Sequence, residues 1–192
     1  MQKQDLSVVG FASAAEWEAW LAENVGASPG VWLKIGKRGA AGSSLTYDEA
    51  LDVALCHGWI DGQKDTFDDE RWLQRFTPRR PGSKWSQRNR SKATELIAQG
   101  RMRPAGLREV ETAKADGRWD AAYAGSSTAT VPDDLQRALD ANPAARDFFA
   151  TLDRQNRYAI LYRVHGAKNP ETRARRIATF VAMLAEGKKL HP

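Results

Sequence analysis

The sequence predicts an α+β fold that is rich in helix, with a small antiparallel sheet and two helices in its N-terminal half and a helical C-terminal half. Two observations lead to this prediction. Before residue 78, short β-branched and aromatic segments alternate with two capped helical segments. After Pro81-Gly82, the apolar residues follow helical spacing instead. The chain has 192 residues, 42% of them hydrophobic, so it can bury a core and is not expected to be disordered.

The helices of the N-terminal half have clear start signals. Ser13 with Glu16, and Thr46 with Glu49, match a capping box, in which two side chains accept hydrogen bonds from each other's free backbone N–H groups. The boxes predict helices at about residues 14–25 and 47–57. Six of the seven Trp residues precede residue 86, which predicts an aromatic core in this half and leaves an aromatic-lined pocket as the alternative.

The strands are expected between and after these helices. The segment Val31 to Ile35 is rich in β-formers and is bounded by Pro29-Gly30 and Gly36. A hairpin is predicted from residues 59–67 and 71–77, because the chain alternates, turns at Asp68-Asp69-Glu70 and returns as far as Pro78. Residues 8–11 provide an extra edge strand.

The remaining chain is predicted to be helical. Helices are expected at about residues 87–99, 104–116, 133–141, 143–165 (with a break near Asp153) and 170–186. The tract from Gly125 to Pro132 has the composition of a linker. We therefore predict an α+β domain at 1–124 with an aromatic core and a basic site, a linker at 125–132, and a helical subdomain at 133–192 that packs on the first.

Composition limits the classes of function. The chain has one cysteine, Cys56, which forbids an intramolecular disulfide and is interpreted as a small core residue, with a nucleophile as the alternative. Three His residues without a ligand motif predict no metal site, and no cofactor motif is present. The apolar run at residues 6–11 is too short for a signal peptide, and no run reaches the ~18 residues of a membrane span. A cytoplasmic location is expected.

Charge is strongly segregated along the chain. Between Arg71 and Arg103 there are ten Lys or Arg residues and one acid, although the whole protein carries only +5. Directly upstream, residues 48–70 contain eight acids and one base, Lys64. Such segregation indicates either a surface field for an anionic partner or an internal pairing of the two blocks.

The basic stretch contains a candidate anion site. Its segment from Arg79 to Ser86 combines guanidinium groups, hydroxyl groups, a Pro-Gly turn and an aromatic ring. Ser86 is a suitable N-cap for the helix that follows, and the N-terminus of a helix attracts anions. The predicted ligand is a small phosphate- or carboxylate-bearing molecule. The predicted ligand-binding residues are Trp59, Asp61, Arg75, Arg79, Arg80, Ser83, Trp85, Ser86 and Asn89.

Other hypotheses remain open. Asp61 and Asp65 could lie opposite Arg75 and Arg71 in the hairpin as an exposed ladder of ion pairs. The basic stripe with Trp72, Phe76 and Trp85 interleaved could instead bind nucleic acid by backbone contacts and base stacking. An enzyme could use Asp61 or Asp65 as a general base, and an interaction or stress protein would need no small-molecule site. Catalysis and oligomeric state stay undecided.

Several motifs resemble a known family. Gly58-Trp59-Ile60-Asp61-Gly62, the segments 75–80 and 83–86 with Asn89, Gly100-Arg101-Met102 with Gly106, and the late segments 167–168 and 171–177 resemble the bacterial YdeI/OmpD-associated family, also labelled bacteriocin-protection proteins. The resemblance runs from about Trp32 to the C-terminus. It implies a role in envelope stress or resistance to cationic antimicrobial peptides, and it supplies no established reaction or catalytic residues. A periplasmic role is suggested for some members. This chain is not expected to have a signal peptide, so it departs from that role.

Overall fold

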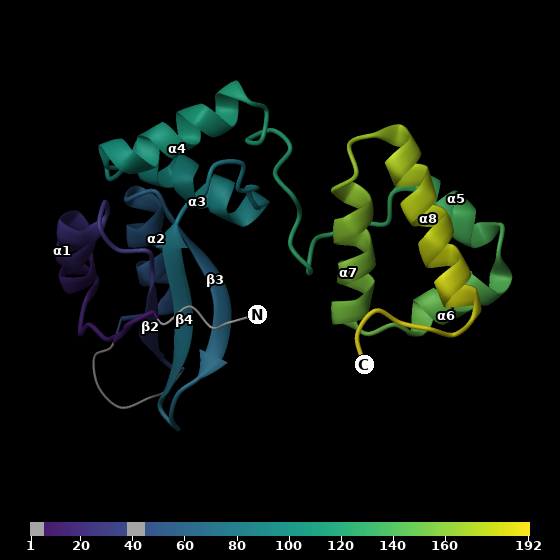
Figure 1. The fold of residues 1–192 in the computed structure, drawn as a ribbon, viewed down its shortest axis with the longest axis horizontal. Helices are drawn as coiled ribbons and strands as arrows, with labels where there is room; N and C mark the ends of the chain where they lie inside the picture. Colours follow the sequence, from purple (N-terminus) through teal and green to yellow (C-terminus); the bar gives the residue numbers. More distant parts are fainter. Residues whose placement is uncertain (1–5, 38–44) are drawn as a thin grey trace. The chain divides into compact units, whose positions relative to one another are not determined.

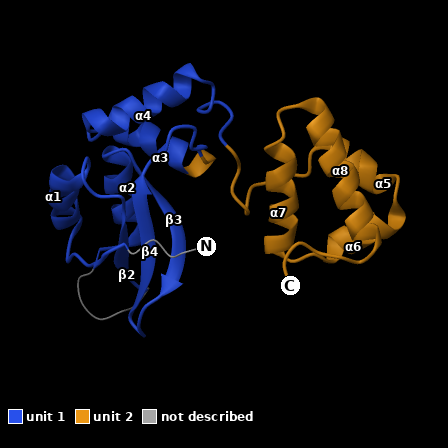
Figure 2. Cartoon of the chain, viewed as in Figure 1, with its two compact units in different colours: residues 1–85, 89–122 blue, residues 86–88, 123–192 orange. Residues whose placement is uncertain are grey.

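The structure, a computed structural model, describes residues 6–37 and 45–192 (Figure 1). Contacts within it divide the chain into two compact units (Figure 2). The first unit comprises Met1–Trp85 and Asn89–Ala122, and the second comprises Ser86–Arg88 and Tyr123–Pro192. The predicted α+β fold is confirmed, with the sheet in the N-terminal half and helices after it.

The first unit contains a four-stranded sheet in the order β1-β2-β4-β3. The strands are β1 (Val8–Val9), β2 (Val31–Gly36), β3 (Trp59–Thr66) and β4 (Arg71–Pro78). The sheet is mixed rather than purely antiparallel, because β1 runs parallel to β2. A helix, α1 (Ala14–Asn24), connects these two strands, and a helical crossover is what brings consecutive strands into parallel pairing.

The other helices of this unit are α2 (Tyr47–Cys56), α3 (Gln87–Ala98) from Asn89 onwards, and α4 (Pro104–Ala115). The capping box at Thr46 and Glu49 is complete. Ser13 also accepts from the N–H group of Glu16, but the Glu16 carboxylate accepts from Ala12, one residue before the position that a full box requires. Both helices begin at the predicted residues, because these signals are local.

The core of the first unit is aromatic, as predicted. The sheet face that carries Val31, Leu33 and Ile35 packs against α1 and α2. Trp17 and Trp59 are fully buried there, with their rings edge to face at a centroid distance of 6.3 Å. The indole N–H group of Trp17 donates to the carbonyl of Ala50 at 3.1 Å, so burial of this ring leaves no polar atom unsatisfied.

A bulge in β3 changes which side chains share a face of the sheet. Asp61 pairs with Phe76 and Lys64 with Gln74, so three residues of β3 advance against two of β4. The buried amide of Gln74 holds the bulge by donating to the carbonyls of Gly62 at 2.9 Å and Gln63 at 3.2 Å.

The bulge overturns the predicted ion-pair ladder. Asp65 pairs with Leu73 and therefore lies on the opposite face from Asp61. Neither carboxylate stands opposite Arg75 or Arg71. The prediction assumed uninterrupted alternation along β3, and one extra residue reverses the faces of everything after it.

The second unit is built from α5 (Asp133–Asp140), α6 (Pro143–Thr151), α7 (Arg154–His165) and α8 (Pro170–Ala185) around its own apolar core. The long helix predicted at 143–165 is divided at the expected break. Asp153 is the N-cap of α7 and accepts a hydrogen bond from the N–H group of Asn156 at 2.8 Å, so α6 and α7 are two separate helices.

Arg173 of α8 joins three helices of this unit. Its guanidinium forms a two-point contact with the Asp134 carboxylate, at 2.6 and 2.9 Å, and donates to the carbonyl of Val164 at 2.8 Å. These hydrogen bonds hold the pKa of Asp134 below its ordinary value. The contacts tie α8 to the start of α5 and to the C-terminal end of α7.

Replacing Arg173 is therefore expected to destabilise the second unit by about 1–2 kcal/mol. Because all seven Trp residues lie in the first unit, Trp fluorescence follows that unit, while circular dichroism reports helices of both. In urea, Arg173→Ala should lower the dichroism midpoint and leave the fluorescence transition in place. The loss should begin to shrink below the ordinary aspartate pKa of about 4 and should disappear as the pH falls through the lowered pKa of folded Asp134.

Arg175→Ala is the matched control, because Arg175 lies two residues away on the same helix and is exposed. Its dichroism midpoint should equal that of the unmodified protein. Equal midpoints for both variants would contradict the structural role of Arg173. Arg173→Lys should behave like Arg173→Ala, since an ammonium group cannot reproduce the two-point contact.

Candidate functional site

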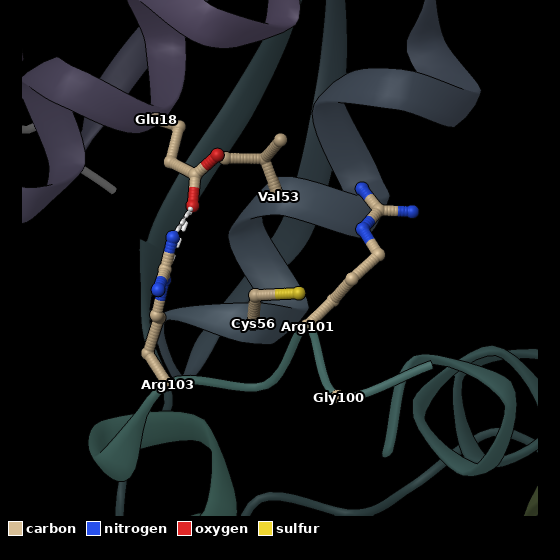
Figure 3. A pocket seen from close by; sticks show the side chains of 6 residues that line it. All are labelled: Glu18, Val53, Cys56, Gly100, Arg101 and Arg103. Carbon is tan, nitrogen blue, oxygen red and sulfur yellow. Dashed lines mark hydrogen bonds and ion pairs between the residues drawn. The ribbon is translucent and has the colours of Figure 1, made fainter. Parts of the chain in front are cut away.

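A cavity of about 200 Å³ lies in the first unit, between α1, α2 and the segment that joins α3 to α4 (Figure 3). Its wall combines one carboxylate, two guanidinium groups, a thiol and two small or apolar residues. The lining residues are Glu18, Val53, Cys56, Gly100, Arg101 and Arg103. Because an apolar cavity of about 150 Å³ can hold benzene, this volume suits a small organic molecule or an inorganic anion.

The turn after α3 places the two arginines. Gly100 has a φ of +68°, a left-handed conformation that suits glycine. Its N–H group donates to Ile97, and the N–H group of Arg101 donates to Leu96, which together form a Schellman motif that ends the helix. The N–H group of Arg103 then donates to the carbonyl of Cys56 at 3.0 Å and fixes the segment against the end of α2.

An ion pair forms one side of the cavity. Arg103 donates from Nε to Oε1 of Glu18 at 3.1 Å and contacts the same oxygen through Nη2. This hydrogen bonding is the main reason that the pKa of Glu18 is lowered, so the carboxylate is ionised at neutral pH. Arg101 stands on the other side of Cys56 (Figure 3). With two guanidinium groups and one carboxylate, the charged wall has a net positive charge.

Cys56 lies between the two arginines and is buried. Burial raises the pKa of its thiol to about 11. The thiol is therefore protonated at physiological pH, which supports the interpretation as a core residue over the alternative of a nucleophile, since a thiolate is the reactive form.

His57 lies beside the ion pair. Its side chain is 6% exposed, and its Nε2 atom is 3.9 Å from Oε1 of Glu18. Burial is the main cause that lowers the pKa of this imidazole, and the charge of Arg103 acts in the same direction. The charge of Glu18 opposes both. The ring is accordingly neutral at pH 7.

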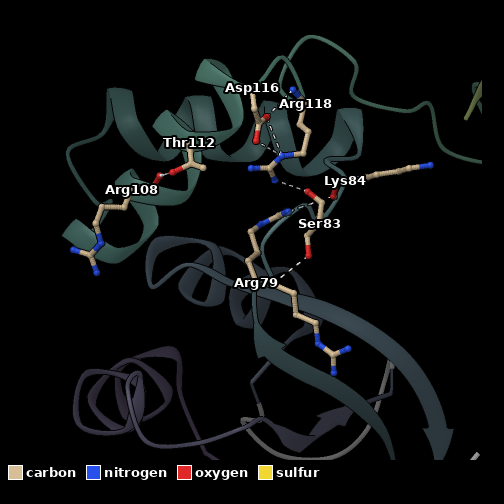
Figure 4. A network of polar contacts seen from close by, with 8 residues as sticks. Arg79, Ser83, Lys84, Arg108, Thr112, Asp116 and Arg118 are labelled. Atoms are coloured by element: carbon tan, nitrogen blue, oxygen red, sulfur yellow. Dashed lines mark hydrogen bonds and ion pairs between the residues drawn. The ribbon is translucent and has the colours of Figure 1, made fainter. Parts of the chain in front are cut away.

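The predicted site residue Arg79 has a different environment from the one expected. It is 6% exposed, its guanidinium carbon lies 3.6 Å from the centre of the Trp85 ring, and Nη1 donates to the carbonyl of Lys84 at 3.3 Å (Figure 4). Trp85 is itself buried and packs edge to face on Trp119, at a centroid distance of 4.8 Å. Arg79 is thus part of a packed cluster.

The turn that follows Arg79 is held by further internal contacts. The N–H group of Arg80 donates to the hydroxyl of Ser83 at 3.2 Å. Arg118 donates to the carbonyl of Ser83 at 2.7 Å and pairs with Asp116, also at 2.7 Å (Figure 4). The side chain of Arg80 is exposed.

Asp61 and Asn89 are brought together, while two other predicted residues lie elsewhere. Half-buried Asp61 accepts from the Tyr47 hydroxyl at 2.8 Å and from the Asn89 amide at 3.2 Å. Arg75 lies on the other face of the sheet and donates to Gln63 at 3.1 Å. Ser86 precedes α3 and forms a β-bridge with Tyr123, and both residues are counted with the second unit. A single ligand site made from the nine predicted residues stays a prediction.

The acidic and basic blocks are partly paired with each other. Lys92 contacts Asp52 at 2.7 Å and Asp48 at 3.4 Å, and Arg71 contacts Asp68 at 3.2 Å. Of the aromatic residues in the basic stripe, Phe76 and Trp85 are buried. These two rings cannot stack on bases, which removes much of the basis for the nucleic-acid hypothesis.

Sequence reasoning did not find the cavity, because Glu18 and Arg103 are 85 positions apart. In the sequence, Arg101 and Arg103 belong to the basic stretch, and Gly100-Arg101-Met102 is one of the motifs of the family resemblance, but nothing indicates a partner for them in residues 14–25. Within residues 6–37 and 45–192, no group of three or more His, Cys, Asp or Glu side chains could hold a metal ion. In the same ranges, no helix combines the length and apolarity that crossing a bilayer requires.

Comparison with known proteins gives two family matches. The family described as "Domain of unknown function (DUF8412)" matches residues 9–109, a range that contains the whole cavity. The family described as "Bacteriocin-protection, YdeI or OmpD-Associated" matches residues 128–187. No curated protein and no solved structure matches the chain.

The second match confirms the YdeI/OmpD-associated resemblance at the C-terminal end. The motifs from Gly58 to Gly106 that also suggested it lie in the range of the other family. The first match covers more than half of the chain, and it includes every residue of the cavity. The protein therefore belongs to the DUF8412 family, and its residues 128–187 are similar to the family described as bacteriocin-protection, YdeI or OmpD-associated.

Proposed function

We propose that the protein binds a small anionic ligand, carrying a phosphate or carboxylate group, in the cavity between Glu18, Arg101 and Arg103. The observation that carries the proposal is the excess of guanidinium over carboxylate on the wall of this cavity. Glu18 pairs with Arg103, while Arg101 is exposed and makes a long hydrogen bond, 3.5 Å, from Nη1 to the side-chain oxygen of Gln99. A bound anion can displace so weak a contact. A planar guanidinium recognises phosphate and carboxylate oxygens by paired hydrogen bonds.

The uncharged residues of the cavity also suit such a ligand. The Cys56 thiol is protonated and buried, so it adds a weak donor without adding negative charge. Val53 supplies an apolar surface for the carbon skeleton of a small acid. The carboxylate of Glu18 keeps Arg103 oriented by a two-point contact.

The binding test is a calorimetric titration with inorganic phosphate, sulfate and short mono- and dicarboxylates. Arg101→Gln is expected to weaken binding of the best of these ligands at least tenfold, equivalent to about 1.4 kcal/mol. Arg108→Gln is the matched control, because Arg108 is an exposed arginine of α4 that does not line the cavity. Its affinity should equal that of the unmodified protein.

Arg80→Gln separates this proposal from the site predicted from sequence. Arg80 is exposed in the turn after β4 and does not line the cavity. Loss of binding in Arg80→Gln together with full binding in Arg101→Gln would move the ligand to the predicted site. Absence of binding by every anion tested would contradict the proposal altogether.

We further propose that this binding serves protection against cationic antimicrobial peptides or envelope stress, from the cytoplasm. Support comes from the description of the family that matches residues 128–187 and, for the compartment, from the single buried thiol. A strain that lacks the protein should be more sensitive to bacteriocin. Arg108→Gln should restore resistance, and Arg101→Gln should not.

A further inference from the structure

His57 contains a buried polar atom that the fold does not satisfy. Its Nε2 atom has no hydrogen-bond partner within the described part of the chain, although the side chain is only 6% exposed. Buried nitrogen atoms nearly always have a partner, so such an exception needs an explanation. Oε1 of the Glu18 carboxylate, which belongs to the wall of the cavity, lies 3.9 Å from this atom.

Both charges of the ion pair act on His57. Glu18 comes from α1, and Arg103 comes from the segment before α4. Arg101 lies across the cavity, and Glu109 of α4 packs beside Gly58, the residue after His57. Cys56, its neighbour on the other side, is neutral at physiological pH. Glu18 is thus the acceptor that a protonated imidazole would contact.

The same oxygen of Glu18 lies next to both Arg103 and His57. Oε1 accepts from Nε and Nη2 of Arg103 and is also the carboxylate oxygen that His57 approaches. At neutral pH the imidazole is uncharged, because burial lowers its pKa, and Arg103 holds the carboxylate alone. A proton taken from solvent onto Nε2 would create a second charged donor that competes for this oxygen.

We propose that protonation of His57 switches the cavity to a state with higher affinity for anions, by drawing Glu18 away from Arg103 and releasing that guanidinium to the ligand. This inference rests on the proposed function and specifies how the site is regulated. The proton comes from solvent, the Nε2–H group donates to Glu18, and no covalent bond other than N–H is formed or broken.

The direction of the pH dependence follows from linkage. A bound anion adds negative charge near the imidazole and favours its protonated form, so binding raises the pKa of His57 and takes up a proton. Affinity therefore increases as the pH falls from the pKa of the bound state towards that of the free state. Above the pKa of the bound state, affinity is constant.

Nuclear magnetic resonance can measure this coupling in the intact protein. Sulfate is the probe, because it stays doubly charged while histidine titrates between about pH 5 and 8. The pKa values of His57, His165 and His191 are measured from the pH dependence of their ring C–H signals, once with sulfate and once with chloride at equal ionic strength. The Nε–H signal of Arg101 reports whether sulfate binds. His57→Asn identifies the His57 signal.

Three outcomes are distinguishable. Sulfate should raise the pKa of His57 by half a unit or more and leave those of His165 and His191, which belong to the second unit, unchanged. A shifted Arg101 signal with an unchanged His57 titration would overturn the coupling and leave the proposed function standing. No response of either residue at any pH would overturn both. If His57→Asn does not fold, His165→Asn and His191→Asn identify the other two signals and leave that of His57 by elimination.

Discussion

Gly106→Ala should destabilise the first unit by about 3 kcal/mol or more, because the added methyl group would collide with the backbone of α2. A Cβ atom at Gly106 would lie 2.3 Å from the carbonyl oxygen of Cys56 and 2.7 Å from that of Leu55. Both are backbone atoms at the end of α2, so they cannot yield as a flexible side chain would. The helices α2 and α4 would have to separate.

The gain in helix propensity does not offset this clash. Replacing glycine by alanine within a helix contributes about 1 kcal/mol at most. Separation of the helices would also break the hydrogen bond from Arg103 to the Cys56 carbonyl, which fixes one wall of the cavity. Gly106→Ala should therefore lose anion binding as well as stability.

Gly26→Ala is the control, because Gly26 is in the same unit and no atom lies within 4 Å of its Cβ position. Its Trp fluorescence midpoint in urea should equal or slightly exceed that of the unmodified protein, since alanine restricts the unfolded chain. A Gly106→Ala midpoint as high as that of Gly26→Ala would show that α2 and α4 do not pack as closely as described.

Most of the helices and strands could be predicted because their signals are local. Thr46 with Glu49 and Asn169 before Pro170 mark helix starts by backbone chemistry within one turn. The features that were missed depend on pairing across the sheet. The parallel direction of β1 follows from the crossover through α1, and the bulge at Gly62-Gln63 is visible only against β4.

The cavity could not be predicted for a related reason. Its two arginines stand in the basic stretch that the sequence singles out, but their partner Glu18 belongs to a helix 85 positions away. Composition also favoured Arg79 as a ligand contact, because an arginine beside a Pro-Gly turn resembles an anion site. Whether its guanidinium faces a ligand or the Trp85 ring depends on packing, which residue types alone do not determine.

Arg79→Ala should be the second most damaging of these substitutions, with a loss of about 2–4 kcal/mol. The guanidinium is almost fully buried and stacks on the Trp85 ring at 3.6 Å, and such a desolvated cation–π contact contributes about 2 kcal/mol. Its hydrogen bond to the Lys84 carbonyl is lost in addition, and the alkyl part of the side chain leaves a void beside the ring.

The expected spectroscopic change is as specific as the loss of stability. Trp85 packs on Trp119, so a disturbance of Arg79 should alter the near-ultraviolet dichroism of both indoles in the folded protein. Arg79→Met keeps most of the apolar contact and removes the charge and the donors. Arg79→Met should therefore lose less stability than Arg79→Ala.

Arg80→Ala is the internal comparison, since Arg80 adjoins Arg79 and is exposed. It should change the urea midpoint by no more than about 0.5 kcal/mol in free energy. If Arg79 served a ligand and not the fold, Arg79→Ala would keep its stability and lose anion binding. Retention of anion binding by the folded fraction of Arg79→Ala, at reduced stability, would instead assign Arg79 to the core and leave the ligand to Arg101.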